Sequence, residues 1–326
     1  MTVAAADISR APTTVDETAS ARGLVDAAAL RALAGRSDLR GGVQFGAHLA
    51  CAAATGLVVW LSLPHWYLLI PAMVLHGVVL VTMFAPMHEC VHRTAFASRA
   101  ANDAVGWLAG VLGFYNATYY RCFHAWHHRY LQDPARDPEL MFPKANSRLA
   151  YLKEISGFTF WCRRAIDYPA LALGRTADLP FVPAGARRAI ARSMSCQLLI
   201  YLAAAGSIAM GFDAALYFWF LPAVLAQPLL RALLIAEHTG CSEDRNGLSN
   251  TRTTLALFPI RLLMWNMPFH TEHHLYPSVP FHRLPALHLK IRDRLVHVAS
   301  GYTATNRAIV RSLNRRRPDP TARRPA

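Results

Sequence analysis

The sequence predicts an all-α membrane protein with four transmembrane helices in two hairpins and a cytoplasmic helical cap. Of the 326 residues, 53% are hydrophobic and 17% are charged, whereas an average soluble domain carries about 25% charged residues. Apolar windows long enough to cross a bilayer also recur along the chain. The composition excludes an intrinsically disordered protein, and the six scattered cysteines exclude a disulfide scaffold and fit reduced thiols facing a cytosol.

Four apolar windows are the candidate membrane spans, and they fall into two pairs. Each window approaches the ~20 residues that a helix needs to cross a hydrocarbon core of ~30 Å. Only short turns separate the two members of each pair, so the spans are expected to form two hairpins. The windows cover residues 43–63, 66–87, 195–211 and 214–235.

Basic residues are distributed unevenly around these windows. The two hairpin turns hold no Lys or Arg, while five basic residues precede the first hairpin, fourteen lie from Arg93 to Arg192, and fifteen lie from Arg231 onward. The positive-inside rule therefore predicts cytoplasmic termini and a cytoplasmic middle segment. The membrane itself is expected to be a bacterial-type inner membrane. The net charge of +14 fits this bias and attraction to anionic lipid headgroups. We expect no nucleic-acid binding, because the basic residues flank membrane segments.

Composition also divides the chain into three expected regions. Residues 1–42 mix arginines and acidic residues with small residues and contain no long apolar run, which predicts a mobile cytoplasmic N-terminal tail. Residues 43–300 hold all four spans and form the membrane domain. Residues 301–326 end in an Arg- and Pro-rich segment, which predicts a basic C-terminal tail.

Eight of the fifteen histidines lie in three short clusters. Residues i, i+3 and i+4 share one face of a helix, so each cluster can direct two or three imidazoles the same way. Neutral imidazole suits Fe, Zn, Cu or Ni, and eight ligands exceed the four that one tetrahedral zinc uses. The cap is therefore expected to hold a histidine-rich dimetal site. The clusters are His88 and His92; His124, His127 and His128; and His270, His273 and His274.

A fifth apolar stretch, residues 104–120, lies between the first two clusters. If it crossed the bilayer, His92 and His124 would lie about 30 Å apart on opposite faces. Its continuous apolar part is shorter than a full span, a length typical of interfacial or re-entrant helices. We therefore expect this stretch to dip into the membrane or lie flat on it.

The three clusters, as HECVH, HAWHH and HTEHHLYP, in this order and interrupted by two hydrophobic hairpins, resemble the integral-membrane fatty acid desaturase superfamily. That superfamily also contains related alkane and carotenoid hydroxylases and ketolases. The resemblance covers residues 43–289, and it implies that the eight clustered histidines hold two iron ions. It also implies a ninth ligand, His238, just after the fourth span. The alternative for His238 is a histidine that meets the negative end of a helix dipole.

Ligand histidines usually donate their second ring nitrogen to a carboxylate or carbonyl. Polar residues within or beside the clusters are candidates for this supporting role, with ordinary surface or helix-cap roles as the alternative. They are Glu89, Asp133, Asp137, Glu237, Asn266 and Glu272.

The resemblance implies an O₂-dependent diiron oxidoreductase. Its expected reaction is fatty acid (acyl-lipid) desaturation, by removal of hydrogen atoms from two neighbouring carbons. The alternative is a hydroxylase, monooxygenase or ketolase acting on an alkyl chain, a carotenoid or a small amphiphile. Aromatic residues are expected to shape the slot for the alkyl chain, with membrane-interface anchoring as their alternative role. They are Trp107, Phe114, Tyr115, Tyr119 and Trp265.

Electrons for this reaction are expected from an external donor, because the chain contains no haem, flavin or dinucleotide fingerprint. The resemblance suggests a ferredoxin or similar protein with its NAD(P)H reductase. Basic residues of the cytoplasmic face could attract an acidic donor. They include Arg121, Arg129, Arg163 and Arg164.

Two rival functions follow from the same histidines. Residues 88–92 match HExxH, the motif of zinc metalloproteases, but an intramembrane protease would leave the other clusters unused. A metal carrier would need ligands inside the spans, where only His48 and His76 are expected. Metal content and O₂ consumption separate these rivals from the oxygenase.

Overall fold

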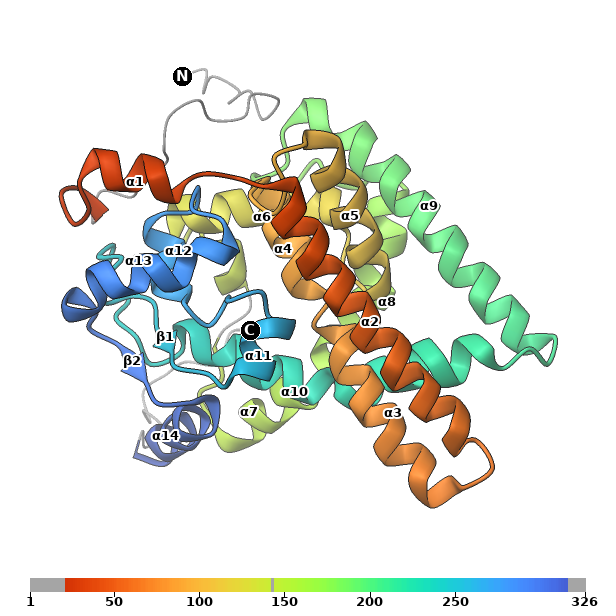
Figure 1. Cartoon of the computed structure of the whole chain (residues 1–326). Coiled ribbons are helices and arrows are strands. Elements are labelled where there is room, and N and C mark those ends of the chain that lie inside the picture. Colours follow the sequence, from red (N-terminus) through yellow and green to blue (C-terminus); the bar gives the residue numbers. More distant parts are fainter. Residues whose placement is uncertain (1–20, 142–143, 316–326) are drawn as a thin grey trace, which may run out of the picture.

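The computed structural model describes residues 21–141 and 144–315 and is almost entirely helical (Figure 1). Two-residue strands form its one parallel pair within the described chain, with Thr253 beside Val298. The elements are α1 (Ala27–Leu33), α2 (Asp38–Ser62), α3 (Trp66–Val81), α4 (Phe84–His92), α5 (Arg99–Leu112), α6 (Ala117–Tyr130), α7 (Arg148–Ile155), α8 (Phe158–Ala172), α9 (Ala184–Ala209), α10 (Leu221–His238), β1 (Thr253–Thr254), α11 (Phe258–Leu263), α12 (His270–Leu275), α13 (Leu284–Ile291), β2 (Val298–Ala299) and α14 (Tyr302–Arg315).

Four helical segments of the described chain are long and apolar enough to cross a membrane: Asp38–Ser62, Trp66–His92, Ala184–Ala209 and Leu216–His238. These segments contain the four expected windows almost completely, and the all-α membrane fold is confirmed. Each extends further on its cap side than expected, because helix formation continues past the apolar run. The first begins at Asp38, where the Ser37 side chain accepts a hydrogen bond from the Arg40 amide.

The second span is broken between α3 and α4. Pro86 lacks the amide that would bond the Thr82 carbonyl in a continuous helix, and the Ala85 amide bonds that carbonyl instead. Helix α4 is buried along almost its whole length. The break lets α4 follow its own course and carry His88 and His92 into the protein interior.

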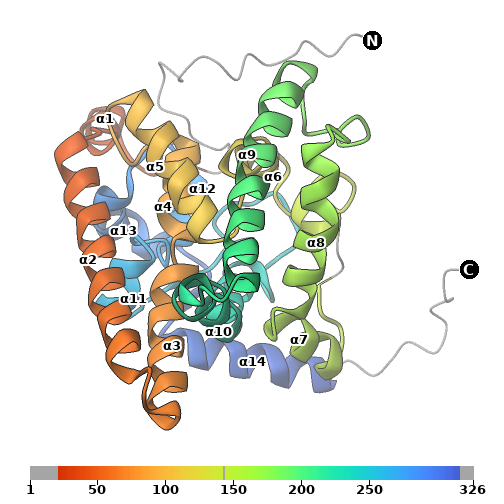
Figure 2. The same cartoon turned by 90° about the vertical axis from the view of Figure 1, so that its right-hand side faces the viewer.

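The two pairs of spans pack differently. Helices α2 and α3 contact each other as expected for a hairpin, and α10 packs against α3. At that crossing a Cβ on Gly77 would lie 2.0 Å from the Pro222 carbonyl oxygen, so only glycine permits the approach. Helix α9 instead packs on α8 and α6, on the side away from α2 and α3 (Figure 2).

The fifth apolar stretch is not among the four candidate spans of the described chain, and it folds back along α4. Helix α5 runs antiparallel to α4, since Gly106 lies against Cys90 and Gly110 against Met87. The chain then reverses at Phe114, which has a φ of 60°, and α6 returns along α4. His124 thus arrives 4.8 Å from His92 between ring centroids.

Both expected tails are partly wrong. Residues 21–33 were assigned to a mobile tail, but Leu30 and Leu33 of α1 are buried in an apolar cluster with Leu284 and Leu287 of α13. Residues 302–315 were assigned to a basic tail, but they form α14, which packs on α7 and α10. In both cases a few apolar side chains anchor a short helix that composition does not reveal. The remainder of the tails, residues 1–20 and 316–326, lies outside the described residues.

Candidate metal centre

Four separate helices supply the nine histidines of the candidate centre. Helix α4 carries two, α6 carries three, the end of α10 carries one and α12 carries three. Asn116 caps α6 by accepting a hydrogen bond from the Tyr119 amide, and its amide nitrogen donates to Gln197 of α9. Helix α12 is buried throughout. The histidines therefore project from helices that are capped or buried.

The first group contains five histidines whose ring nitrogens lie within 4.8 Å of one another: His88, His92, His124, His128 and His273. Within this group, the Nε2 atom of His128 lies close to two others. His128 Nε2 is 3.0 Å from His124 Nε2 and 3.2 Å from His273 Nε2.

The second group contains the other four histidines. The ring nitrogens of His127, His238 and His274 lie within 4.8 Å of one another. His270 joins them, because its Nε2 is 3.1 Å from both His238 Nε2 and His274 Nε2. The structure thus brings together all nine histidines that the sequence singled out, in groups of five and four.

The nitrogen geometry fits metal ions better than hydrogen bonds. The single Nε2 of His270 cannot be donor and acceptor to two facing ring nitrogens at once. Both ring nitrogens of His88 and Nε2 of His92 are buried and find no hydrogen-bond partner among the described residues, which is costly in a metal-free interior. Ligands bound at 2.0–2.1 Å to one ion lie about 3.0–3.4 Å from each other, which matches the observed spacings.

The charge state of the histidines also suits metal binding. Burial, reinforced by the neighbouring histidines, lowers the pKa of most of them well below its usual value. The rings are therefore neutral near pH 7, and a lone pair is available for coordination. The affected residues outside the membrane spans are His124, His128, His270, His273 and His274.

His127 differs from the other histidines because carboxylates face it. Its Nδ1 lies 2.9 Å from Asp137 Oδ1, and its Nε2 lies 3.7 Å from Glu139 Oε2. Burial opposes the charged ring, but the two carboxylates outweigh it and raise the pKa of His127. Asp137 itself accepts the Gln132 and Glu139 amides, so it is held in place to orient the His127 ring.

Two further predicted carboxylates lie beside a histidine, and one lies elsewhere. Glu237 Oε2 is 3.4 Å from His270 Nε2. Glu272 is buried and bonds His288 of α13 and Thr253 of β1, so it anchors α12 to these neighbouring elements. Glu89 is also buried, but its contacts are Thr94 and the Phe281 amide.

Asp133 and Asn266 do not face the histidines. Asp133 forms an ion pair with Arg136. The Asn266 amide nitrogen donates to the Phe281 carbonyl, and its side-chain oxygen accepts from Arg261. Both residues stand near a histidine cluster in the sequence, and this proximity suggested a supporting role. The chain turns between them and the ligand rings, and at Asn266 the turn is seen in a φ of 57°.

The remaining histidines of the spans have structural partners. His76 contacts the Thr55 hydroxyl at 2.8 Å and the Phe218 carbonyl at 3.0 Å. His48 contacts the Val79 carbonyl at 2.9 Å. Both join neighbouring helices, and neither belongs to the two groups.

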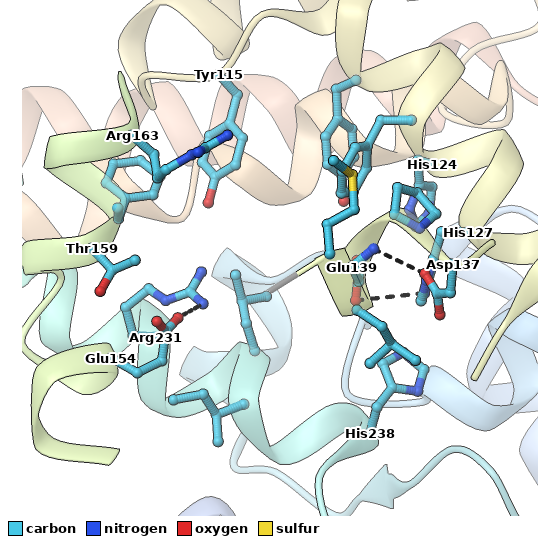
Figure 3. Close-up of a pocket in the computed structure, with 18 of the residues that line it drawn as sticks. Tyr115, His124, His127, Asp137, Glu139, Glu154, Thr159, Arg163, Arg231 and His238 are labelled. Atoms are coloured by element: carbon cyan, nitrogen blue, oxygen red, sulfur yellow. Dashed lines mark hydrogen bonds and ion pairs between the residues drawn. The ribbon is translucent and has the colours of Figure 1, made fainter. Parts of the chain in front are cut away.

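A cavity of about 610 Å³ opens onto the histidines. Rings of the centre, including His88, His124 and His270, form one part of its wall. In Figure 3, His124, His127 and His238 lie on one side, and Tyr115, Thr159, Arg231 and Glu154 lie on the other. Of the aromatics expected to shape a slot, Tyr115 and Tyr119 line this cavity, and the other three do not.

Sequence reasoning missed Glu139 and the charged wall of the cavity. Glu139 lies in a single 3₁₀ turn, Pro138–Met141, outside the histidine clusters. Glu139 is not spaced three or four residues from a candidate ligand histidine, so the helical pattern could not identify it as a site residue. Arg231 lies within a span and pairs with Glu154 of α7. An arginine in an apolar helix is itself a signal of function, and it could have pointed to the cavity.

Four candidate spans and a buried, histidine-rich centre define a membrane protein with a candidate dimetal site. Comparison with known proteins gives the family. A profile of the fatty acid desaturase family matches residues 47–306, so the chain belongs to this family. The chain is also similar to a dihydrorhizobitoxine desaturase of Bradyrhizobium elkanii, with 27% identity over 262 residues that cover 71% of this chain and 68% of that protein. The protein is therefore a desaturase-like oxidoreductase, and the resemblance drawn from the histidine clusters is confirmed.

Proposed function

We propose that the protein is an O₂-dependent desaturase whose nine grouped histidines hold two iron ions. One observation carries the proposal: buried imidazoles from four helices gather in two groups at one wall of a cavity. No protein side chain can oxidise an unactivated C–H bond, so the oxidant must come from a cofactor. Imidazole suits iron, and more than four ligands suits two ions with open positions.

The balanced reaction converts a CH₂–CH₂ unit, O₂, two electrons and two protons into CH=CH and two molecules of water. Bound iron would supply the activation of O₂ and the removal of hydrogen atoms. The protein's own residues orient the ligands and hold the substrate. Asp137 orients His127, and the aromatic wall formed by Phe84, Tyr115 and Tyr120 excludes water and positions the alkyl chain.

Hydroxylation is the main alternative within the same chemistry. It consumes the same O₂, electrons and protons but yields an alcohol and one water. Desaturation is preferred because the similar Bradyrhizobium elkanii protein is named a desaturase. A fatty acyl chain fits the name of the family, whereas the similar protein is named for dihydrorhizobitoxine.

The metalloprotease alternative is disfavoured by the geometry of Glu89. In an HExxH protease this glutamate must face the zinc-bound water. Here its carboxylate bonds Thr94 and the Phe281 amide, while His88 and His92 belong to a group of five histidines. A carrier would need its ligands along the spans, but His48 and His76 bond neighbouring helices.

We further propose that the centre and both termini face the cytoplasm and that an acidic ferredoxin, or similar donor, delivers the electrons. The distribution of basic residues supports this orientation. Arg129 is exposed on α6, the helix that carries three of the histidines, and it is a candidate contact for the donor.

The test is expression in a bacterial host together with a ferredoxin and its reductase, followed by mass spectrometry of lipids and small amphiphiles. The proposal predicts products lighter by two hydrogens, which depend on O₂ and are absent when His127 or His273 is replaced by alanine. Products heavier by one oxygen would support the hydroxylase. Turnover that survives both replacements would refute either reaction at this centre.

A further inference from the structure

The wall of the cavity that faces the histidines carries an arginine that pairs with no carboxylate of the residues the structure describes. Arg164 of α8 lines the cavity. Its guanidinium carbon lies 4.7 Å from the Tyr115 ring centroid, and Tyr115 lies across the cavity from His124 and His127 (Figure 3). The charge of Arg164 is therefore presented at the end of the cavity opposite the candidate metal centre.

Contacts on three sides hold the guanidinium in a fixed orientation. Its Nε donates to the Phe114 carbonyl at 3.0 Å, and its carbon also lies 4.2 Å from the Phe160 ring centroid and 5.4 Å from that of Tyr168. The aromatic faces stabilise the cation without neutralising it. A guanidinium carries further donors on its terminal nitrogens besides Nε, so one that is held in this way is preorganised to bind an oxyanion.

Two other arginines of the cavity wall are already paired with carboxylates, whereas Lys144 of the wall bonds the Gln132 side-chain oxygen. Arg163 pairs with Asp167 at 3.0 Å, and Arg231 pairs with Glu154. The remaining acidic residues of the wall lie at the histidine end, beside His127 or His270: Asp137, Glu139 and Glu237. Within the described residues, no carboxylate bonds Arg164, so this end of the cavity keeps a net positive charge.

We propose that Arg164 binds the anionic group, a carboxylate or a phosphate, of a single-chain substrate whose alkyl part extends toward the histidines. The identification of this ligand as the substrate rests on the proposed function, but the binding site itself does not. A cavity of about 610 Å³ falls in the range that encloses one small molecule of about drug size. That size favours a single-chain amphiphile over a two-chain membrane lipid.

The first test compares ligands on the unaltered protein. The full chain in lipid nanodiscs is titrated calorimetrically at pH 7 with octanoate, octyl phosphate and octan-1-ol, with empty nanodiscs as the blank. At least one anion should bind about tenfold more tightly than the alcohol, since a charged hydrogen bond contributes about 1.5–3 kcal/mol. The tighter of the two anions identifies carboxylate or phosphate as the natural group. Equal affinity of all three ligands would overturn the proposal.

The second test replaces Arg164. Arg164→Gln should abolish the preference for the anion and leave the affinity for octan-1-ol unchanged, while Arg164→Lys should keep part of the preference. Arg188→Gln is the matched control, because Arg188 is exposed on α9 and does not line the cavity. A preference that survives in Arg164→Gln would contradict the assignment.

A third variant separates binding from structural support. The Tyr168 hydroxyl donates to the same Phe114 carbonyl as Arg164. If Arg164 served only to fix the turn at Phe114, Tyr168→Phe would also weaken anion binding, and that outcome would refute the proposal. Because calorimetry does not depend on turnover, anion binding without any oxidised product would sustain this inference while the proposed desaturation failed.

Discussion

The two ends of the cavity stabilise their buried polar groups in opposite charge states. At the histidine end, burial keeps most of the rings neutral, and within the described residues several ring nitrogens have no hydrogen bond. At the arginine end, aromatic rings and a carbonyl surround a group that stays charged. Neutral, converging lone pairs suit a metal cation, whereas a fixed cation suits an anionic ligand.

This difference separates chemistry from recognition. The first end is expected to determine whether a C–H bond is oxidised at all, and the second is expected to determine which molecule is held and where its chain lies. Changes at the histidine end should therefore alter metal content and turnover, while changes at the arginine end should alter the apparent affinity. The following predictions test that division from the largest effect to the smallest.

Replacing a histidine of either group should have the largest effect. His273→Ala removes a nitrogen from the group of five and His127→Ala removes one from the group of four. Each should lower the metal content and abolish product, because a missing ligand leaves the ion exposed and misplaced. Elemental analysis and mass spectrometry check this. Normal metal content with full turnover in either variant would remove that histidine from the centre.

Asp137→Asn should have an intermediate effect at the same end. The carboxylate that orients His127 at 2.9 Å is replaced by an amide of the same shape. Outer carboxylates of this kind typically contribute 10- to 100-fold to metal affinity or activity. A competition assay with a metal chelator measures the affinity. An unchanged affinity would show that Asp137 does not tune the centre.

Arg164→Gln should alter kinetics in a different way. With the natural substrate or an accepted surrogate acid, KM should rise about tenfold, as expected for the loss of one charged hydrogen bond. The metal content should stay constant. Steady-state kinetics on protein of known iron content distinguishes a change in KM from a change in metal content. A lower iron content without a change in KM would place the role of Arg164 in folding of the site.

Arg129→Glu lies outside both ends of the cavity and should have the smallest effect. An exposed ion pair contributes about 0.2–1 kcal/mol, a factor of about 1.5 to 5. The variant should lower the rate at limiting donor concentration by this factor, and the deficit should shrink at high salt because such charges are screened. Donor titrations at two ionic strengths measure it, and identical curves for both proteins would exclude Arg129 from donor docking.

The histidine end could be predicted from the sequence because its information is local. The i, i+3 and i+4 spacings on α6 and α12 point several rings the same way, and the shared-face requirement then predicts that the fifth apolar stretch does not cross the membrane. Asp137 was found because it follows the second cluster closely. The pairing of the nine rings into groups of five and four depends on how α4, α10 and α12 meet, and no local pattern specifies that.

The arginine end could not be predicted in the same way. Arg163 and Arg164 are adjacent on α8 and look equivalent in sequence, and both were expected on a surface for a donor. Arg163 pairs with Asp167 one turn further along α8, and that spacing is visible in the sequence. The contact of Arg164 with the Tyr115 ring, from the turn before α6, depends on packing that no local pattern specifies. The sequence analysis did not predict helices α1 and α14 for a related reason. Each has few apolar residues, and these stabilise the helix only by packing on other helices of the fold.

The most direct test of the account is the metal content of the purified, full-length protein. The account predicts about two irons per chain, with a Mössbauer spectrum of nitrogen-rich iron sites that is perturbed in both His127→Ala and His273→Ala. Protein that contains no iron when produced in iron-replete cells, or that contains one zinc per chain, would contradict it.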